Sequence, residues 1–181
     1  MLSHNKLISQ KPVFKTKFFE VTEDKIELPN GEIHTHQNIY RAATSTVFPV
    51  TDSYEIYLIK QYRYLYGKYI YEAVSGYIEE GETPLSNAKK ELEEEAGIIA
   101  NSWKKLSKIY LAGSVIKGET HIFLAQNLRM VNPKRESDEQ IEVQKMSLDQ
   151  ALNLILREDV VTASTIIGLL LLDKMRREGK I

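Results

Sequence analysis

Segments of two kinds alternate along this chain of 181 residues, and together they predict a protein with both strands and helices. Short runs rich in β-branched and aromatic residues indicate strands at 13–19, 21–28, 32–40, 42–49, 55–61, 69–74, 103–111, 119–127 and 141–146. Apolar residues recur every three to four positions, as in amphipathic helices, at 83–97, 147–157 and 162–177. Pro29, Asn30 and Gly31 predict a tight turn between the second and third strands.

The stretch from residue 76 to residue 98 carries most of the information about function. Its second half predicts a short helix, because Thr83 can cap it, Pro84 suits its first turn and Gly97 suits a left-handed stop. One face of this helix should be buried, and it carries Leu85, Ala88, Leu92 and Ala96.

Three glutamates, Glu91, Glu94 and Glu95, lie away from that apolar face, within one turn of each other. Carboxylates at this spacing repel by roughly 0.2 to 0.5 kcal/mol per pair, and a hard cation turns the repulsion into binding. Carboxylate oxygens are the ligands that Mg²⁺ and Mn²⁺ prefer. A run of glutamates alone is more often a solvated face, so a metal site here depends on the surrounding residues.

Those surrounding residues stand in a fixed register. Gly76 precedes Glu82 by six positions, and Glu91 follows nine positions later. The register resembles the Nudix box, which reads G, five residues, E, seven residues, R-E-U-x-E-E-x-G-U, where U is a bulky aliphatic residue. The matching positions are Gly76, Glu82, Glu91, Leu92, Glu94, Glu95, Gly97 and Ile98. Lys90 stands where the family has arginine, and because lysine lacks the planar fork of arginine we expect weaker metal affinity.

This resemblance implies a loop–helix–loop that holds a divalent metal ion, Mg²⁺ or alternatively Mn²⁺, against a diphosphate. It implies Glu91 and Glu95 as the principal metal ligands, and the carbonyl of Ser75 as a backbone ligand. Glu94 lies beside them and is counted among the catalytic residues. Glu82 is expected to orient the helix through hydrogen bonds.

A second resemblance lies upstream of the box. Gln61 and Arg63 form a Q-x-R ending of a strand that resembles the ADP-ribose pyrophosphatase branch, in which the arginine contacts the diphosphate. Glu72 matches a glutamate just before the box in this branch, where it is expected either to bond a ribose hydroxyl or to support the helix. The alternative for Arg63 is a surface position packed against Tyr62 and Tyr64.

The polar loop 132–140 runs directly into a predicted strand. An acidic loop is usually only solvated. In the Nudix family, however, a glutamate from this loop reaches the metals and orients or deprotonates the attacking water. Glu139 is the first candidate, as base and as metal ligand, followed by Glu136 and Asp138.

The resemblance also implies a Nudix α/β/α sandwich with a mixed β-sheet at residues 42–181, preceded by an N-terminal β-strand extension at residues 1–41. In nucleoside diphosphate sugar hydrolases such an extension builds the dimer, so a homodimer is expected. Formal net charge is −1 without a basic stripe, which argues against nucleic-acid binding. With no cysteine, no signal-like start and no apolar run of membrane length, we expect a cytoplasmic protein that binds no membrane.

The sequence therefore predicts Mg²⁺-dependent hydrolysis of nucleoside diphosphate sugars of the ADP-ribose, ADP-glucose or GDP-mannose type. Many ADP-ribose hydrolases carry a proline about fifteen residues after the box, and segment 110–114 has none, so the preferred base and sugar stay open. One alternative is a housecleaning hydrolase of nucleoside triphosphates or capped RNA. Another is a sensor that binds a diphosphate sugar without cutting it.

Overall fold

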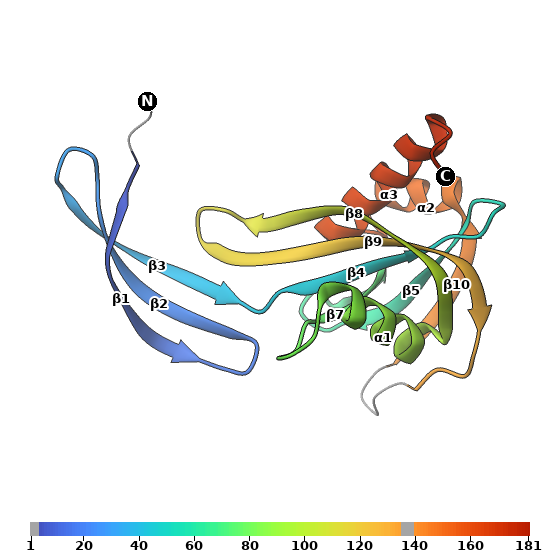
Figure 1. Cartoon of the computed structure of the whole chain (residues 1–181), viewed down its shortest axis with the longest axis horizontal. Coiled ribbons are helices and arrows are strands. Elements are labelled where there is room, and N and C mark those ends of the chain that lie inside the picture. The colour runs from blue at the N-terminus through green and yellow to red at the C-terminus, as the bar shows by residue number, and fades with distance from the viewer. Residues whose placement is uncertain (1–3, 135–139) are drawn as a thin grey trace. The chain divides into compact units, whose positions relative to one another are not determined.

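The computed structural model describes residues 4–134 and 140–181. Its elements are β1 (Lys6–Lys15), β2 (Phe19–Glu27), β3 (Ile33–Arg41), β4 (Thr44–Pro49), β5 (Glu55–Arg63), β6 (Lys68–Glu72), β7 (Val74–Tyr77), α1 (Pro84–Ala96), β8 (Ile98–Ala112), β9 (Ile116–Met130), β10 (Ile141–Ser147), α2 (Leu148–Leu156) and α3 (Ala163–Arg177) (Figure 1). They form two compact units, Met1–Ala43 with Tyr110–Glu119, and Thr44–Ile109 with Thr120–Ile181.

The smaller unit contains the antiparallel strands β1, β2 and β3. Gly31 has a positive φ of +86° in the predicted turn between β2 and β3. The prediction of a first strand at 13–19 was wrong, because β1 begins at Lys6 and ends at Lys15. Thr16 causes the break: its Oγ1 accepts hydrogen bonds from the N–H groups of Phe18 (3.2 Å) and Phe19 (3.1 Å), which competes with the strand ladder.

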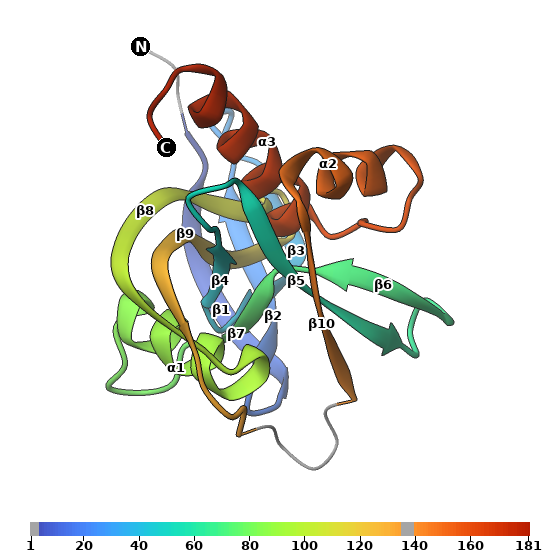
Figure 2. The ribbon, with the colours of Figure 1, turned by 90° about the vertical axis from the view of Figure 1, so that its right-hand side faces the viewer.

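In the larger unit, strand β4 is buried along its whole length and separates two hydrophobic clusters. Successive side chains of a strand point to opposite faces. Val47 accordingly packs with Ala88 and Leu92 of α1, whereas Phe48 packs with residues of α2 and α3. Figure 2 shows α1 on one side of the strands and the two C-terminal helices on the other.

The sheet around β4 is mixed, since β4 runs parallel to β9 and antiparallel to β7. A separate sheet has the strand order β10–β5–β6. The predicted α/β/α sandwich with a mixed sheet is therefore confirmed.

The predicted strand 69–74 is in fact the meeting point of two strands. Strand β6 ends at Glu72 and pairs with β5, whereas β7 begins at Val74 and pairs with β4. Between them, the N–H of Ala73 donates to Thr165 Oγ1 of α3 at 3.1 Å. The α3 hydroxyl thus satisfies the backbone where the chain leaves one sheet for the other.

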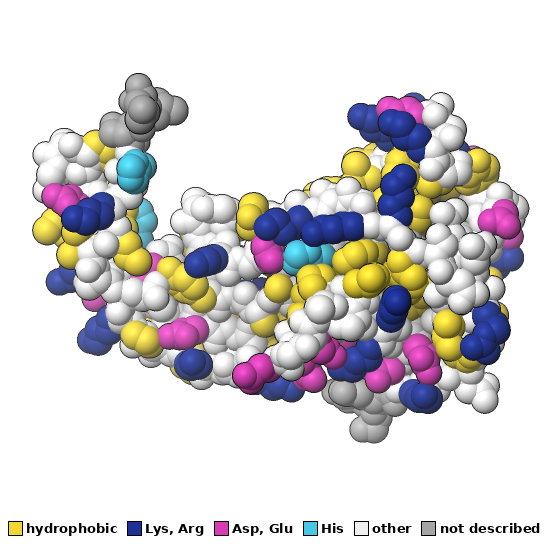
Figure 3. All heavy atoms as spheres, in the orientation of Figure 1, with side chains coloured by type: hydrophobic (Ala, Val, Ile, Leu, Met, Phe, Trp, Pro, Cys, Tyr) yellow, Lys and Arg dark blue, Asp and Glu magenta, His cyan; other side chains and the backbone are white. Residues whose placement is uncertain are grey.

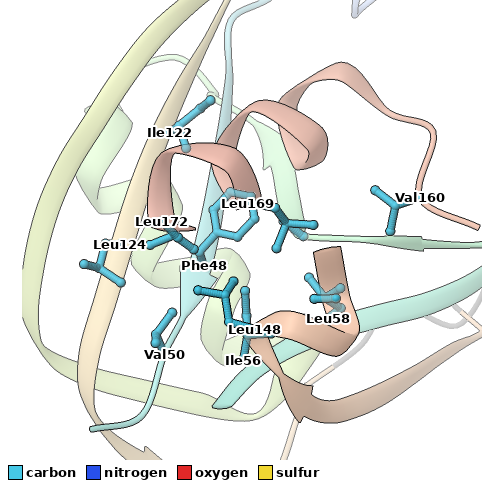
Figure 4. Packing of buried hydrophobic residues seen from close by; sticks show 12 residues of the cluster. Phe48, Val50, Ile56, Leu58, Ile122, Leu124, Leu148, Val160, Leu169 and Leu172 are labelled. Atoms are coloured by element: carbon cyan, nitrogen blue, oxygen red, sulfur yellow. The ribbon is translucent and has the colours of Figure 1, made fainter. Parts of the chain in front are cut away.

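Helices α2 and α3 close the second face of the sandwich. Ser147 caps α2 as predicted, in a capping box with Gln150. Phe48 lies against α3 so closely that a Cβ on Gly168 would be 2.1 Å from its ring (Figure 4 shows Phe48 among Leu148, Leu169 and Leu172). Among the described helices, none is both long and apolar enough to cross a membrane.

Candidate active site

Helix α1 is the frame of the candidate site, and its ends are formed by the predicted residues. Thr83 Oγ1 accepts from the N–H of Ser86 at 3.1 Å, and Pro84 is the first helical residue. Gly97 ends the helix in the left-handed region at φ +64°. One expectation was wrong: Leu85 is 36% exposed, because it lies in the first turn beyond the cluster that buries Ala88, Leu92 and Ala96.

The three box glutamates lie in the second half of α1 with different exposures. Glu95 is only 7% exposed, whereas Glu91 and Glu94 are half-buried. Figure 3 shows acidic and basic side chains interspersed over the region of α1. The acidic face is thus not simply a solvated one, since one of its carboxylates is withdrawn from solvent.

Gly76 explains how the carboxylate of Glu91 reaches the backbone of β7. A Cβ on Gly76 would lie 2.1 Å from Cδ and from Oε1 of Glu91. Only glycine leaves room for this approach, which brings the Glu91 carboxylate against Gly76. The hydroxyl of Ser75 donates to the carbonyl of Ser45 at 2.9 Å and so anchors β7 to β4.

Gly97 holds the chain that leaves β9 against the end of α1. The N–H of Val131 donates to the carbonyl of Gly97 (2.8 Å), and a Cβ on Gly97 would lie 2.5 Å from the carbonyl oxygen of Val131. The N–H of Lys134 then donates to the carbonyl of Glu94 at 3.0 Å. The polar loop therefore starts at the glutamate end of α1.

The loop candidates Glu136, Asp138 and Glu139 lie outside the residues that the structure describes. Strand β10 follows the loop, and its first residue, Ile141, is the register partner of Gln61 in β5. Both described flanks of the loop are therefore bound to elements that carry site residues.

Lys90 is held by the acidic residues at the start of the box. Its Nζ lies 3.3 Å from Glu82 and 3.7 Å from Glu79. Burial alone would lower the pKa of Lys90, but the hydrogen bond and charge of Glu82, with Glu79 and Glu91, outweigh it and raise the pKa. The hydrogen bond from the N–H of Glu79 lowers the pKa of Glu82, in spite of partial burial. Both groups are therefore charged at neutral pH.

Asn87 is a residue of this network that the sequence reasoning missed. It is fully buried, and its Nδ2 donates to the carbonyl of Tyr77 (2.9 Å) and to the carboxylates of Glu82 (3.2 Å) and Glu91 (3.1 Å). The signal was available in its spacing, since Asn87 precedes Glu91 by four positions and so lies next to it on the helix.

Gln61, Arg63 and Glu72 come together on the β5–β6 pair. Arg63 Nε donates to Glu72 Oε2 at 2.7 Å, and Gln61 Nε2 donates to the same oxygen at 3.0 Å. Glu72 is buried, whereas Arg63 is half-exposed. Arg63 is therefore bonded to a buried carboxylate on the neighbouring strand, although it lies at the surface.

The oxygen donors fit a hard cation, although they do not by themselves complete a site. Within residues 4–134 and 140–181, no three His, Cys, Asp or Glu side chains are grouped as a metal site would require. Glu91 and Glu95 belong to one helix face, and Glu91 lies against Gly76. Two carboxylates and a backbone carbonyl are the donor types that Mg²⁺ and Mn²⁺ prefer, with water and substrate phosphate as further ligands.

Known proteins resemble this chain over most of its length. The NUDIX domain model matches residues 39–165. An ADP-ribose pyrophosphatase of Bacillus subtilis (strain 168) is 33% identical over 162 residues, 88% of each chain. A methanol dehydrogenase activator of Bacillus methanolicus is 26% identical over 169 residues, 92% of this chain and 91% of that protein.

The fold is shared with a solved structure described as an ADP compounds hydrolase. It superimposes with a TM-score of 0.88 at 23% identity, over 100% of this chain and 99% of the other. The family model covers more than half of the sequence, and it includes the box glutamates and the Q-x-R strand. The chain therefore belongs to the Nudix family.

Proposed function

We propose that this protein is a cytoplasmic hydrolase that cuts the diphosphate bond of nucleoside diphosphate sugars, releasing a nucleoside monophosphate and a sugar phosphate. The observation that carries the proposal is the three box glutamates on α1, together with an arginine that a buried glutamate holds in place. The Bacillus subtilis relative, named as an ADP-ribose pyrophosphatase, supports a diphosphate sugar as the substrate class.

The box residues would hold the metal ion, Mg²⁺ or in its place Mn²⁺. Glu91 and Glu95 would be its carboxylate ligands, Glu94 a neighbouring carboxylate, and Ser75 a carbonyl ligand. Such a cation neutralises charge that develops on diphosphate oxygens and makes water a better nucleophile. The close approach of Glu91 to Gly76, which directly follows Ser75, supports Glu91 and Ser75 as ligands of one ion.

Arg63 would bind the diphosphate. Its Nε is already bonded to Glu72, and its two terminal nitrogens form no ion pair with any described residue. A guanidinium oriented in this way can donate two parallel hydrogen bonds to phosphate oxygens. Gln61 shares the bond to Glu72 and so keeps the carboxylate, and with it Arg63, in one orientation. Glu139, and after it Glu136 and Asp138, are our candidates for orienting the attacking water.

The decisive experiment is a substrate panel with purified protein and Mg²⁺. ADP-ribose, ADP-glucose and GDP-mannose are incubated with the protein, and phosphate released by added phosphatase is measured. We expect turnover of at least one of them, in preference to pyrophosphate release from nucleoside triphosphates. Binding of all three without turnover of any would indicate a sensor and would overturn the proposal.

We also propose that the protein is a homodimer through its N-terminal strands. The support is a set of large apolar side chains that are exposed on β1, β3 and the turn before β2: Leu7, Ile8, Val13, Phe14, Phe18 and Ile33. Exposed apolar surface of this extent is typical of interaction sites. The mass in solution, measured by light scattering, should be twice that of the 20.8 kDa chain, and a monomer at micromolar concentration would contradict the proposal.

A further inference from the structure

Position 87 lies among the seven positions that the box pattern leaves unspecified between Glu82 and Lys90. Asparagine is an unfavourable residue inside a helix, and burying its amide costs solvation that must be returned by hydrogen bonds. Asn87 nevertheless lies in α1 with no exposed surface. Its burial therefore calls for an explanation other than helix stability.

The contacts of the amide are one-sided. A primary amide nitrogen carries two hydrogens, and here three acceptors share them: the carbonyl of Tyr77 and the carboxylates of Glu82 and Glu91. The amide oxygen, Oδ1, has no hydrogen-bond partner among the described residues. A buried amide oxygen without a hydrogen bond lowers stability. The arrangement therefore favours a role for Asn87 in the contacts that its nitrogen makes.

Glu91 is confined between this amide and the backbone. Asn87 Nδ2 lies 3.1 Å from its Oε1, and Gly76 is so close that a Cβ there would be 2.1 Å from the same oxygen. These two neighbours restrict the rotamers of the Glu91 side chain. A carboxylate restricted in this way is prepared to bind a cation without first losing rotamer freedom.

Lys90 stands at the position of the box arginine but differs from arginine in the bonds that it can make. Lys90 Nζ forms ion pairs with Glu82 and Glu79, but a single ammonium lacks the planar fork with which arginine makes bidentate bonds. Asn87 makes the missing connection, because the same nitrogen contacts both Glu82 and Glu91. The chain Lys90–Glu82–Asn87–Glu91 is continuous in hydrogen bonds.

We infer that Asn87 is a positioning residue that couples Glu82 to Glu91 and holds Glu91 ready for the divalent cation, in place of the box arginine. The inference rests on the proposed function, since it takes Glu91 as a metal ligand. It adds a residue at a position that the box pattern leaves unspecified.

The test measures Mn²⁺ binding without substrate, by electron paramagnetic resonance, beside the Mg²⁺ dependence of hydrolysis. In N87A we expect Mn²⁺ affinity to fall by about 10–100-fold, the usual effect of losing a partner of a metal ligand. The Mg²⁺ concentration for half-maximal rate should rise in the same proportion. Rate at saturating Mg²⁺ should change far less, and thermal unfolding in metal-free buffer should show a folded protein.

Two further variants separate positioning from a general effect on the helix. In N87A/K90R the guanidinium can bond two carboxylates, so most of the lost Mn²⁺ affinity should return. Asn153 is an exposed asparagine of α2, and N153A, the matched control, should bind Mn²⁺ as the unchanged protein does. Absence of rescue by K90R would overturn the assignment of the arginine's task to Asn87.

E91Q distinguishes failure of this inference from failure of the proposed function. If the unchanged protein binds no Mn²⁺, or if E91Q binds it equally well, the proposed metal site itself is wrong. If E91Q loses Mn²⁺ while N87A keeps it, the metal site stands and the role of Asn87 is wrong.

Discussion

Helix α1 and the N-terminal sheet of β1–β3 differ in which of their residues are buried. In α1 the apolar face is buried in a core cluster that includes Val47 and Ile98. In the sheet, Thr22 and Asp24 are buried, whereas Phe14 on β1 and Ile33 on β3 are more than half exposed. One element is completed by the core of its own chain, and the other leaves its apolar residues in solvent.

This difference matches the different roles that we propose for the two regions. The proposed site on α1 needs a rigid arrangement of charges, which the core behind it and the glycines at 76 and 97 favour. The sheet exposes several large apolar side chains, as interaction surfaces do, which supports the proposed dimer. Changes in α1 should therefore alter turnover with little effect on assembly, and changes in the sheet should do the reverse.

The largest effect is expected from E95Q. The substitution keeps the shape of the side chain but removes the charge of a proposed metal ligand that is nearly buried. Hydrolysis at fixed Mg²⁺ should fall by at least about 100-fold, more than the loss of a supporting partner would cause. Circular dichroism and dimer mass should stay unchanged.

E93Q is the matched control for E95Q, because Glu93 is on the same helix and pairs with Lys134 near the surface. It should keep nearly full activity. Normal turnover in E95Q would show that the metal ligands have been assigned to the wrong carboxylates.

A smaller loss is expected from R63K. Lysine retains the charge but cannot bond Glu72 and a diphosphate through separate nitrogens. Losing one charge-assisted hydrogen bond, of about 1.5–3 kcal/mol, corresponds to a drop in kcat/KM of about 10–150-fold. The Mg²⁺ requirement should not change, in contrast to E95Q. R129K changes an exposed arginine and serves as the control; a KM and kcat unaffected in R63K would exclude diphosphate binding by Arg63.

Two glycine variants, G76A and G168A, separate the site from the core. In G76A the new methyl group meets the flexible end of Glu91, so we expect a folded protein with reduced activity. In G168A it meets the ring of Phe48 inside the core, which should cost about 1–3 kcal/mol of stability through overpacking. G76A should therefore lower activity per folded molecule with little change in thermal unfolding, and G168A should lower the unfolding temperature with little change in activity per folded molecule. Equal losses of stability in both variants would contradict the proposed role of Gly76.

Local signals in the sequence predicted much of this architecture. Thr83, Pro84 and Gly97 bound α1, and Ser147 caps α2, because caps depend on a few neighbouring residues. The three glutamates of α1 are neighbours on the helix because spacings of three and four positions match the helical repeat. Each of these features depends on residues only a few positions apart, so the sequence pattern predicts it directly.

The contacts that the sequence did not reveal join distant segments. The division of the predicted strand 69–74 depends on Thr165 of α3, and the burial of Glu95 depends on how α1 docks onto the sheet. The bond between Arg63 and Glu72 requires the β5–β6 register. Asn87 was missed because its burial depends on how α1 packs against the strands, although its spacing from Glu91 was visible in the sequence.

The smallest expected effect concerns Asp24, the buried carboxylate of the N-terminal sheet. It is 2% exposed, and its Oδ2 accepts hydrogen bonds from Asn38 Nδ2 (2.8 Å) and the Tyr40 hydroxyl (3.2 Å). Burial alone would raise the pKa of Asp24, but several side-chain hydrogen bonds, of which that of Asn38 has the largest effect, together outweigh it and lower the pKa below the ordinary value of 3.8.

A carboxyl group with a pKa lower in the folded than in the unfolded protein stabilises the fold above the unfolded pKa, and this contribution is lost as pH falls through the folded pKa. D24N removes the titrating group but keeps an oxygen that Asn38 and Tyr40 can bond. At pH 7 the variant should therefore unfold at a slightly lower temperature than the unchanged protein. The difference should shrink as pH falls below about 4, the ordinary range of an unfolded aspartate.

Hydrolysis at pH 7 should not change in D24N, because Asp24 belongs to the sheet and its hydrogen bonds with Asn38 and Tyr40 involve no proposed site residue. A temperature difference that stays constant from pH 7 to pH 3 would show that the charge of Asp24 contributes nothing to the sheet.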